Sequence, residues 1–158
     1  MNHFITAILI GASVTIMAAC TPSLNDTPAT STHVTQASLK GNWQAIRIEG
    51  KNLSGNTQHL PELNFDADNQ RISGTDGCNR VMGHFKTNDD QIKLSPLAST
   101  KMMCVENMQD SDAFHLAMAK VEHFRITQEN HLQLLDANGA VMVEFVPQQH
   151  HDNSPQTS

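Results

Sequence analysis

Short runs in which apolar and polar residues alternate dominate residues 39–147, and most runs are followed by residues that favour turns. Alternation with a period of two places every second side chain on one face, as in a β-strand with one buried side. Six such runs predict strands, at residues 43–48, 63–65, 92–94, 124–126, 132–134 and 141–145. Their close spacing favours antiparallel neighbours, as in a meander, a sandwich or a barrel.

Polar residues with turn chemistry separate these runs, because Asn, Asp and Gly tolerate turn conformations at little cost. The predicted turns lie at residues 66–69, 88–90, 128–130 and 136–139. The pair Asn138-Gly139 is the clearest hairpin signal, because both residue types accept a positive φ.

One segment breaks the alternation and predicts a helix. Apolar residues recur there at helical spacing, namely Phe114, Ala117, Met118 and Val121. Asp110 or Ser111 is the expected N-cap, and Asp112 is favourable near the helix N-terminus. The fold class that follows is mostly β, a small antiparallel barrel-like domain with one short amphipathic helix as a plug or cover.

The chain begins with an uncharged apolar run of signal-peptide length, residues 4–19, too short to read as a spanning helix. Ala18-Ala19-Cys20 resembles the lipobox of bacterial lipoproteins, although the start lacks the usual Lys or Arg. We therefore expect a lipoprotein signal peptide at residues 1–19 and lipidation of Cys20, with an ordinary cleaved signal as the alternative. Thr21 stands where Asp would resemble an inner-membrane retention signal, so this resemblance implies the periplasmic face of the outer membrane.

Residues 20–38 are rich in Thr, Ser and Pro and predict a lipid-anchored flexible linker. Residues 148–158 form a polar stretch that predicts a disordered tail. Between them, residues 39–147 have the size of one domain with one core.

The composition excludes some partners. The net charge is −6, with 10 basic and 16 acidic residues, and the basic residues are scattered along the chain. Phosphate binding needs a basic surface, so nucleic acid is not an expected partner. One Trp and no Tyr argue against a stacking platform or an aromatic sugar site.

Three signatures occur in order along the domain: the opening Leu39-Lys40-Gly41-Asn42-Trp43, the glycine-rich segment 73–80, and Leu97–Cys104. In this order they closely resemble the META domain, the module of the HslJ heat-shock lipoproteins. The motif residues are Gly77, Cys78, Asn79, Arg80, Gly83, Ser99, Thr100 and Cys104. The resemblance implies a small β-barrel with a helix in the bacterial envelope, no established enzymatic activity, and a link to heat shock and novobiocin tolerance.

The residues of this motif favour structural roles. Gly74, Gly77 and Gly83 permit tight backbone and close strand approach, and the segment they occupy is interpreted as a turn. Asn79 can bind its own turn, and Arg80 can reach nearby carbonyls or Asp76. Ser99 and Thr100 are interpreted as backbone hydrogen-bonding residues.

After lipidation of Cys20, Cys78 and Cys104 remain as an even pair in an oxidising compartment and are expected to form a disulfide. Oxidation would remove a cysteine nucleophile, even though His84 and Arg80 lie near Cys78 in sequence.

Other catalytic or metal chemistry has little support. The nine histidines and the Met/Cys cluster at 102–108 lack the spacing of a dedicated metal site, and no Gly-x-Ser-x-Gly or Ser-x-x-Lys occurs. We expect no catalytic residue, no metal, no cofactor and no enzymatic activity.

The resulting hypothesis is a non-enzymatic envelope lipoprotein with a role in heat-shock or envelope stress, or in drug tolerance, through contacts with an envelope protein. The alternative is a lipocalin-like carrier, since Gly41-Asn42-Trp43 also fits the Gly-x-Trp that opens lipocalin-like barrels. A carrier needs internal space, whereas the residues expected to point inward are bulky: Ile46, Ile48, Leu63, Phe65, Leu132, Leu134 and Phe145.

Overall fold

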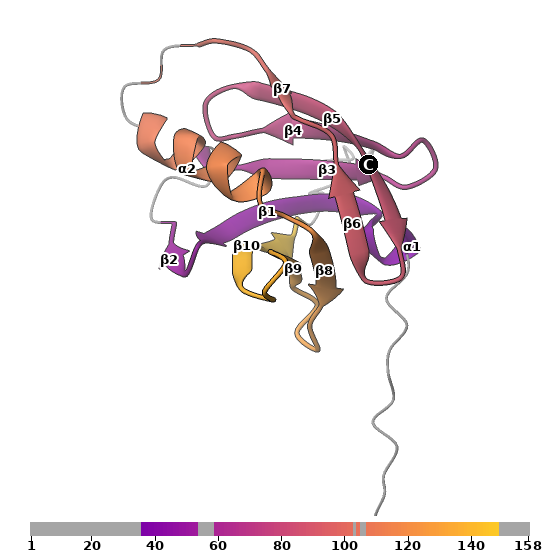
Figure 1. Ribbon diagram of the computed structural model, residues 1–158. Helices are drawn as coiled ribbons and strands as arrows, with labels where there is room; N and C mark the ends of the chain where they lie inside the picture. Colours follow the sequence, from indigo (N-terminus) through magenta and orange to yellow (C-terminus); the bar gives the residue numbers. More distant parts are fainter. Residues whose placement is uncertain (1–35, 54–58, 103, 105–106, 149–158) are drawn as a thin grey trace, which may run out of the picture. The chain divides into compact units, whose positions relative to one another are not determined.

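The computed structural model describes residues 36–53, 59–102, 104 and 107–148. Two helices lie in this part of the chain, α1 (Gln36–Leu39) and α2 (Met108–Met118) (Figure 1). The strands are β1 (Gly41–Ile48), β2 (Lys51–Asn52), β3 (Glu62–Asp66), β4 (Arg71–Thr75), β5 (Arg80–Asn88), β6 (Gln91–Leu94), β7 (Ala98–Ser99), β8 (His123–Ile126), β9 (Leu132–Leu135) and β10 (Val141–Pro147).

The sheet closes on itself because β1 pairs with both β3 and β10. Antiparallel neighbours follow in the order β1-β3-β4-β5-β6-β8-β9-β10, which makes a closed eight-stranded barrel. Two short strands lie off this path, with β2 on β1 and β7 on β5. The predicted mostly β, barrel-like fold is confirmed.

Large apolar side chains fill the interior. Five phenylalanine side chains are almost fully inaccessible to solvent, together with leucine, isoleucine and valine from most strands of the barrel. The rings of Phe65 and Phe85 meet edge to face at 5.3 Å between centroids. On α2, Phe114 is fully buried and meets Phe145 of β10 edge to face at 6.4 Å. Burial of this ring holds α2 against the barrel.

All six predicted strands are present, but β4, β5 and the two short strands β2 and β7 were not predicted, and the glycine-rich segment 73–80 was interpreted as a turn. The structure divides that segment between the end of β4, a four-residue loop and the start of β5. A Cβ at Gly74 would lie 1.9 Å from the Glu62 carbonyl oxygen of β3, so this glycine allows two strands to approach closely. The glycine serves the sheet here and not a turn.

The expectation that Ile46 points inward is wrong. The pairing of β1 with β10 shifts register between Ala45 and Arg47, as at a β-bulge. An extra residue reverses the alternation, so Ala45 is fully buried while Ile46 is half-buried.

Each of the four predicted turns connects two neighbouring strands. In the last of them, the Asp136 carboxylate accepts the amides of Asn138 at 2.9 Å and Ala140 at 2.8 Å. In the Asn138-Gly139 pair, Gly139 has a positive φ, of 82°, and the predicted hairpin joins β9 to β10.

The predicted helix is present and buries the expected Phe114, Ala117 and Met118, but it ends before Val121, which is buried in the segment after it. It starts earlier than predicted, with Asn107 at the N-cap in place of Asp110 or Ser111. Ser111 is instead a buried helix residue. This change matters because it brings Ser111 to the site described below.

At the N-terminal side, α1 combines the last three residues of the predicted linker with Leu39, the first residue of the predicted domain. Leu39 is fully buried, and its carbonyl accepts the Trp43 indole N–H at 2.8 Å. Cys20, the leader, the linker to residue 35 and the tail from residue 149 lie outside the described residues. Among the described helices, none is long and apolar enough to cross a membrane.

Candidate functional site

The loop between β4 and β5 is organised by one carboxylate. Asp76 is fully buried and accepts the backbone amides of Cys78 at 2.8 Å and Asn79 at 2.5 Å. Its second oxygen accepts the Asn79 side-chain amide at 3.2 Å. An Asp that binds amides two and three residues ahead is an established way to shape a tight loop. The side chain of the first loop residue therefore fixes the conformation of the loop that carries Cys78.

Asn79 and Arg80 join this loop to the segment that follows β7. The Met102 amide donates to Asn79 Oδ1 at 2.7 Å. The Arg80 amide donates to the Thr100 hydroxyl, and the Thr100 amide donates to the Arg80 carbonyl, both at 3.1 Å. The two halves of the sequence motif are thus hydrogen-bonded to each other.

A disulfide adds a covalent link between the same two segments. Cys78 and Cys104 are joined with an S–S distance of 2.03 Å and a Cα–Cα distance of 5.8 Å. A closure of 26 residues reduces the entropy of the unfolded chain by an amount worth about 3.5 kcal/mol. The link also anchors the chain just before α2.

Helix α2 reaches the loop through His115, whose Nε2 lies 2.9 Å from Asp76 Oδ2. Burial by itself raises the pKa of the Asp76 carboxyl. Hydrogen bonds from the Asn79 and Cys78 amides and from the His115 and Ser111 side chains outweigh it and hold that pKa below its ordinary value. One ionised carboxylate therefore joins the β4–β5 loop to α2.

Two motif glycines make room for neighbouring chain. Gly77 has a φ of 93°, and a Cβ there would lie 2.5 Å from the His59 carbonyl oxygen. A Cβ at Gly83, in β5, would lie 2.8 Å from Leu97 Cδ2. A larger residue at Gly77 would be strained and would meet backbone, whereas one at Gly83 would have to displace the end of the Leu97 side chain.

The structure brings most of the predicted motif residues into this one cluster, around the disulfide. Ser99 is exposed, and its hydroxyl donates to the Thr100 carbonyl at 3.1 Å. The Arg80 side chain is exposed, and the side chain from α2 that contacts Asp76 is that of His115. Cys20 lies outside the described residues.

The sequence analysis missed Ser111 and His115. The two residues are four positions apart on α2, so they share a face beside the apolar stripe. That spacing was the signal available, but a polar pair on a helix has no defined partner until the fold supplies Asp76.

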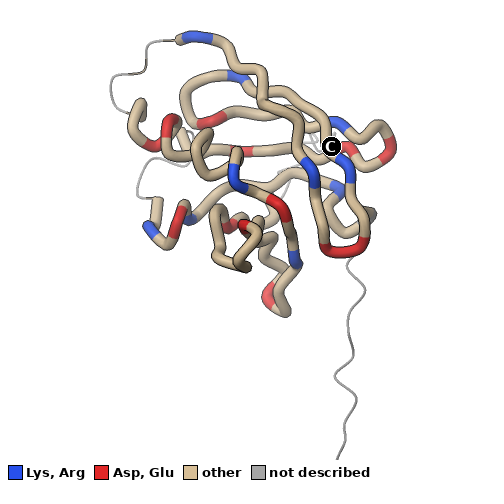
Figure 2. Tube along the Cα trace, viewed as in Figure 1, with Lys and Arg blue, Asp and Glu red and all other residues tan. Residues whose placement is uncertain are grey.

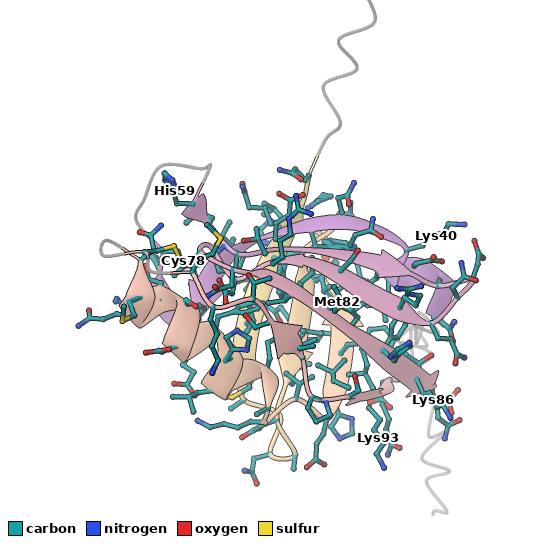
Figure 3. All side chains as sticks on the ribbon, turned by 90° about the horizontal axis from the view of Figure 1, so that it is seen from above. Lys40, His59, Cys78, Met82, Lys86 and Lys93 are labelled. Atoms are coloured by element: carbon teal, nitrogen blue, oxygen red, sulfur yellow. A yellow bond between two sulfur atoms is a disulfide. The ribbon has the colours of Figure 1, made fainter. Side chains whose placement is uncertain are left out.

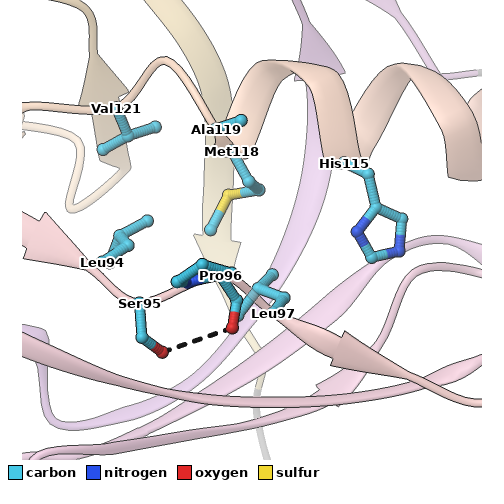
Figure 4. A pocket seen from close by; sticks show the side chains of 8 residues that line it. All are labelled: Leu94, Ser95, Pro96, Leu97, His115, Met118, Ala119 and Val121. Atoms are coloured by element: carbon cyan, nitrogen blue, oxygen red, sulfur yellow. Dashed lines mark hydrogen bonds between the residues drawn. The ribbon is translucent and has the colours of Figure 1, made fainter.

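A surface hollow of about 340 Å³ lies beside this cluster, between the C-terminal end of α2 and the chain after β6 (Figure 4). Its lining is mostly apolar and includes Leu94, Leu97, Met118 and Val121, with His115 at one side. Ser95 lies across the hollow, where its hydroxyl accepts the His84 amide at 2.9 Å. In the described part of the chain, no three His, Cys, Asp or Glu side chains converge as metal ligands.

Comparison with known families gives the decisive match. The META domain family matches residues 36–149. This chain belongs to the META domain family. The match spans the whole barrel, and its start coincides with α1 and not with residue 39. The cluster around Asp76 and Cys78–Cys104 therefore lies within the META domain.

Solved structures share this fold. One NMR structure has 24% identity and a TM-score of 0.58, covering 72% of this chain and 95% of that one. An NMR structure of a protein from Burkholderia xenovorans has 19% identity and a TM-score of 0.55, covering 82% and 99%. A crystal structure of a DUF4847 family protein from Bacteroides vulgatus has 13% identity and a TM-score of 0.52, covering 71% and 96%. No curated protein matches the sequence significantly.

Proposed function

We propose that this META-domain protein is a non-enzymatic lipoprotein of the bacterial envelope. Lipid on Cys20 would hold it at the periplasmic face of the outer membrane. There it would act in heat-shock or envelope stress, or in novobiocin-type drug tolerance, through contacts with an envelope protein. The observation that carries this proposal is the structural use of the motif, whose residues join the β4–β5 loop to the segment before α2 by hydrogen bonds and a disulfide.

The filled interior supports protein contacts over ligand carriage. Phe65, Phe85 and Phe145 occupy the space that a carrier would keep open. Trp43 is buried in the same core and hydrogen-bonded to Leu39. Trp43 does not line any of the three surface hollows found beside β5, β6 and α2. Within the described residues, these three hollows therefore give no support to the lipocalin-like alternative.

Exposed apolar side chains on α2 provide a surface for a protein partner. Leu116 is 65% exposed and Met108 is 49% exposed, although both belong to the helix that packs on the barrel. Met102, 61% exposed, precedes the same helix. Large apolar side chains that remain in water often mark contact sites.

The anchor is tested by fractionation of cells that express the full chain. The wild-type protein should pellet with membranes and incorporate labelled fatty acid, whereas Cys20→Ser should lose the label and leave the outer-membrane fraction. Incorporation of label by the Cys20→Ser variant, or its absence from the wild type, would contradict the assignment of the anchor.

The role is tested by complementation of a deletion strain under heat and under novobiocin. The wild type should restore survival, and the double variant Met108→Glu, Leu116→Glu should not, although it folds. Asp112→Lys, an exposed change on the same helix, is the control and should complement. Full complementation by the double variant would show that α2 is not the contact surface. A deletion strain without any defect under heat or novobiocin would contradict the stress role.

A further inference from the structure

The ten Lys and Arg residues all lie in the described part of the chain and differ in their partners. Four bind a carboxylate: Lys40–Asp68, Arg47–Glu144, Lys51–Asp110 and Lys120–Glu49. Arg125 donates to Gln133 at 2.7 Å. The other five form no ion pair among the described residues, and they are Arg71, Arg80, Lys86, Lys93 and Lys101.

The unpaired cations share one side of the barrel. Arg71 lies on β4, Arg80 and Lys86 on β5, and Lys93 on β6, each at an exposed position of its strand. Lys101 follows Thr100, which pairs with Arg80. These three strands contain no Asp or Glu, although the chain as a whole carries a net charge of −6. The basic residues are scattered in sequence, but the fold collects the unpaired ones.

Within this group, Lys86 and Lys93 are directly opposite each other in the antiparallel register. Figure 2 shows these basic positions side by side on β5 and β6, with acidic residues only at the hairpin turn. Like charges in facing positions destabilise a sheet. An external anion would offset this repulsion.

An exposed methionine lies among the cations. Met82 is 54% exposed and lies on the same side of β5 as Arg80 and Lys86. Figure 3 looks down on this surface and shows Met82 farther along the strand from Lys86, with Lys93 beside Lys86. We call the outer surface formed by Arg71, Arg80, Met82, Lys86 and Lys93 the basic face.

The first described residue lies at one end of this face. Gln36 donates to the Ala67 carbonyl in the β3–β4 turn and accepts the Thr87 hydroxyl of β5 at 3.2 Å. Thr87 follows Lys86 directly. Successive side chains of a strand point to opposite faces, so Gln36 contacts the inner side of β5, at the barrel end next to Lys86.

We propose that the basic face docks on an anionic lipid surface, with Met82 entering the headgroup region. Lys86 and Lys93 line one hollow of about 320 Å³, but Arg71 and Arg80 lie outside it, on β4 and at the start of β5. This spread over three strands fits a surface of many headgroups better than a single small anion. Basic residues near an anionic membrane contribute additively, and an apolar side chain among them adds burial at the interface. Carboxylates border the face at the strand ends: Asp66 and Asp68 in one turn, and Asp89 and Asp90 in another.

The test measures binding of the full chain to vesicles of phosphatidylcholine with and without phosphatidylglycerol. It uses a Cys20→Ser background, so its outcome does not depend on lipidation. The quantity compared is the ratio of the affinities for the two vesicle types, in which any contribution of the apolar leader cancels. Arg71→Gln, Lys86→Gln, Lys93→Gln should lower that ratio about fivefold per charge, on the order of 100-fold in total. Met82→Gln should weaken binding to anionic vesicles without changing its salt dependence.

The matched control is Lys40→Gln, Lys51→Gln, Lys120→Gln, which removes the same charge from cations that have carboxylate partners. It should retain anionic-vesicle binding within a few-fold. Equal loss in both triple variants would overturn the proposal, because net charge and not the face would then drive binding. Capture by heparin without any preference for anionic vesicles would also overturn it, in favour of a soluble polyanion.

Discussion

Burial removes water from the Asp76 carboxylate, so donors from the protein must balance its charge. Backbone amides of its own loop and a side chain 39 residues away, His115, supply them. A single residue thereby fixes the loop that carries Cys78 and the position of α2. An apolar residue there would leave those amides without an acceptor.

Asp76→Asn should lower the free energy of unfolding at neutral pH by about 2–3 kcal/mol, because charged hydrogen bonds to a buried group are lost. The folded-state pKa of Asp76 is depressed. Its stabilising contribution is therefore complete above the unfolded pKa of about 3.9 and disappears as pH falls through the folded value. Urea unfolding should show the difference between variant and wild type shrinking from pH 5 to pH 2.

The exposed Asp112→Asn serves as the control for this experiment and should stay within about 0.5 kcal/mol of the wild type at every pH. A difference between Asp76→Asn and wild type that does not change with pH would show that the carboxylate's charge is not what stabilises the loop.

At the scale of elements, α2 is held from two sides. Phe114 packs into the barrel against Phe145, while the disulfide and the His115–Asp76 contact hold its start and its middle. The helix exposes Leu116 on its other side. The helix therefore has one face that stabilises the domain and an opposite, exposed face that is available to a partner.

Phe114→Ala should cost about 3–5 kcal/mol in the free energy of unfolding, because it removes a fully buried ring and leaves a cavity. Leu116→Ala, two positions away and exposed, should change stability by no more than about 0.5 kcal/mol. Urea unfolding followed by circular dichroism measures both. Similar costs for the two variants would contradict the assigned orientation of α2.

At the scale of the whole molecule, the barrel closes through pairing of β1 with β10, the first and last of its strands. Loss of either strand would leave its two neighbours with exposed edges, which the closed barrel does not have. Trp43 lies on β1 within the core and reports on this closure.

We expect a single unfolding transition in which Trp43 fluorescence and far-UV circular dichroism coincide, as for a cooperative domain. A chain that ends at Ala140 should fail to fold, because β1 and β9 both lose a partner, whereas one that ends at Gln148 should unfold like the full chain. Separate transitions for the two probes, or a folded chain without β10, would contradict cooperative closure.

The features that depend only on residues close together in the sequence could be predicted from it. Six strands followed from alternation with a period of two, the turns from Asn, Asp and Gly, and the helix from the spacing of Phe114, Ala117 and Met118. The motif around Cys78 also identified the family, because it is a linear pattern. Local preference and side-chain periodicity are encoded within a few residues, so no partner has to be known.

The tertiary structure determined the features that depend on contacts between segments far apart in the sequence. The bulge that buries Ala45 in place of Ile46 arises between β1 and β10, and Gly74 belongs to a strand because β3 approaches it. The bond between Asp76 and His115, and the collection of unpaired cations on β4, β5 and β6, likewise join segments far apart in sequence. The sequence alone determined which segments could become strands and a helix. Only closure of the barrel determined their neighbours, because burial and charge at each position depend on residues brought there by the fold.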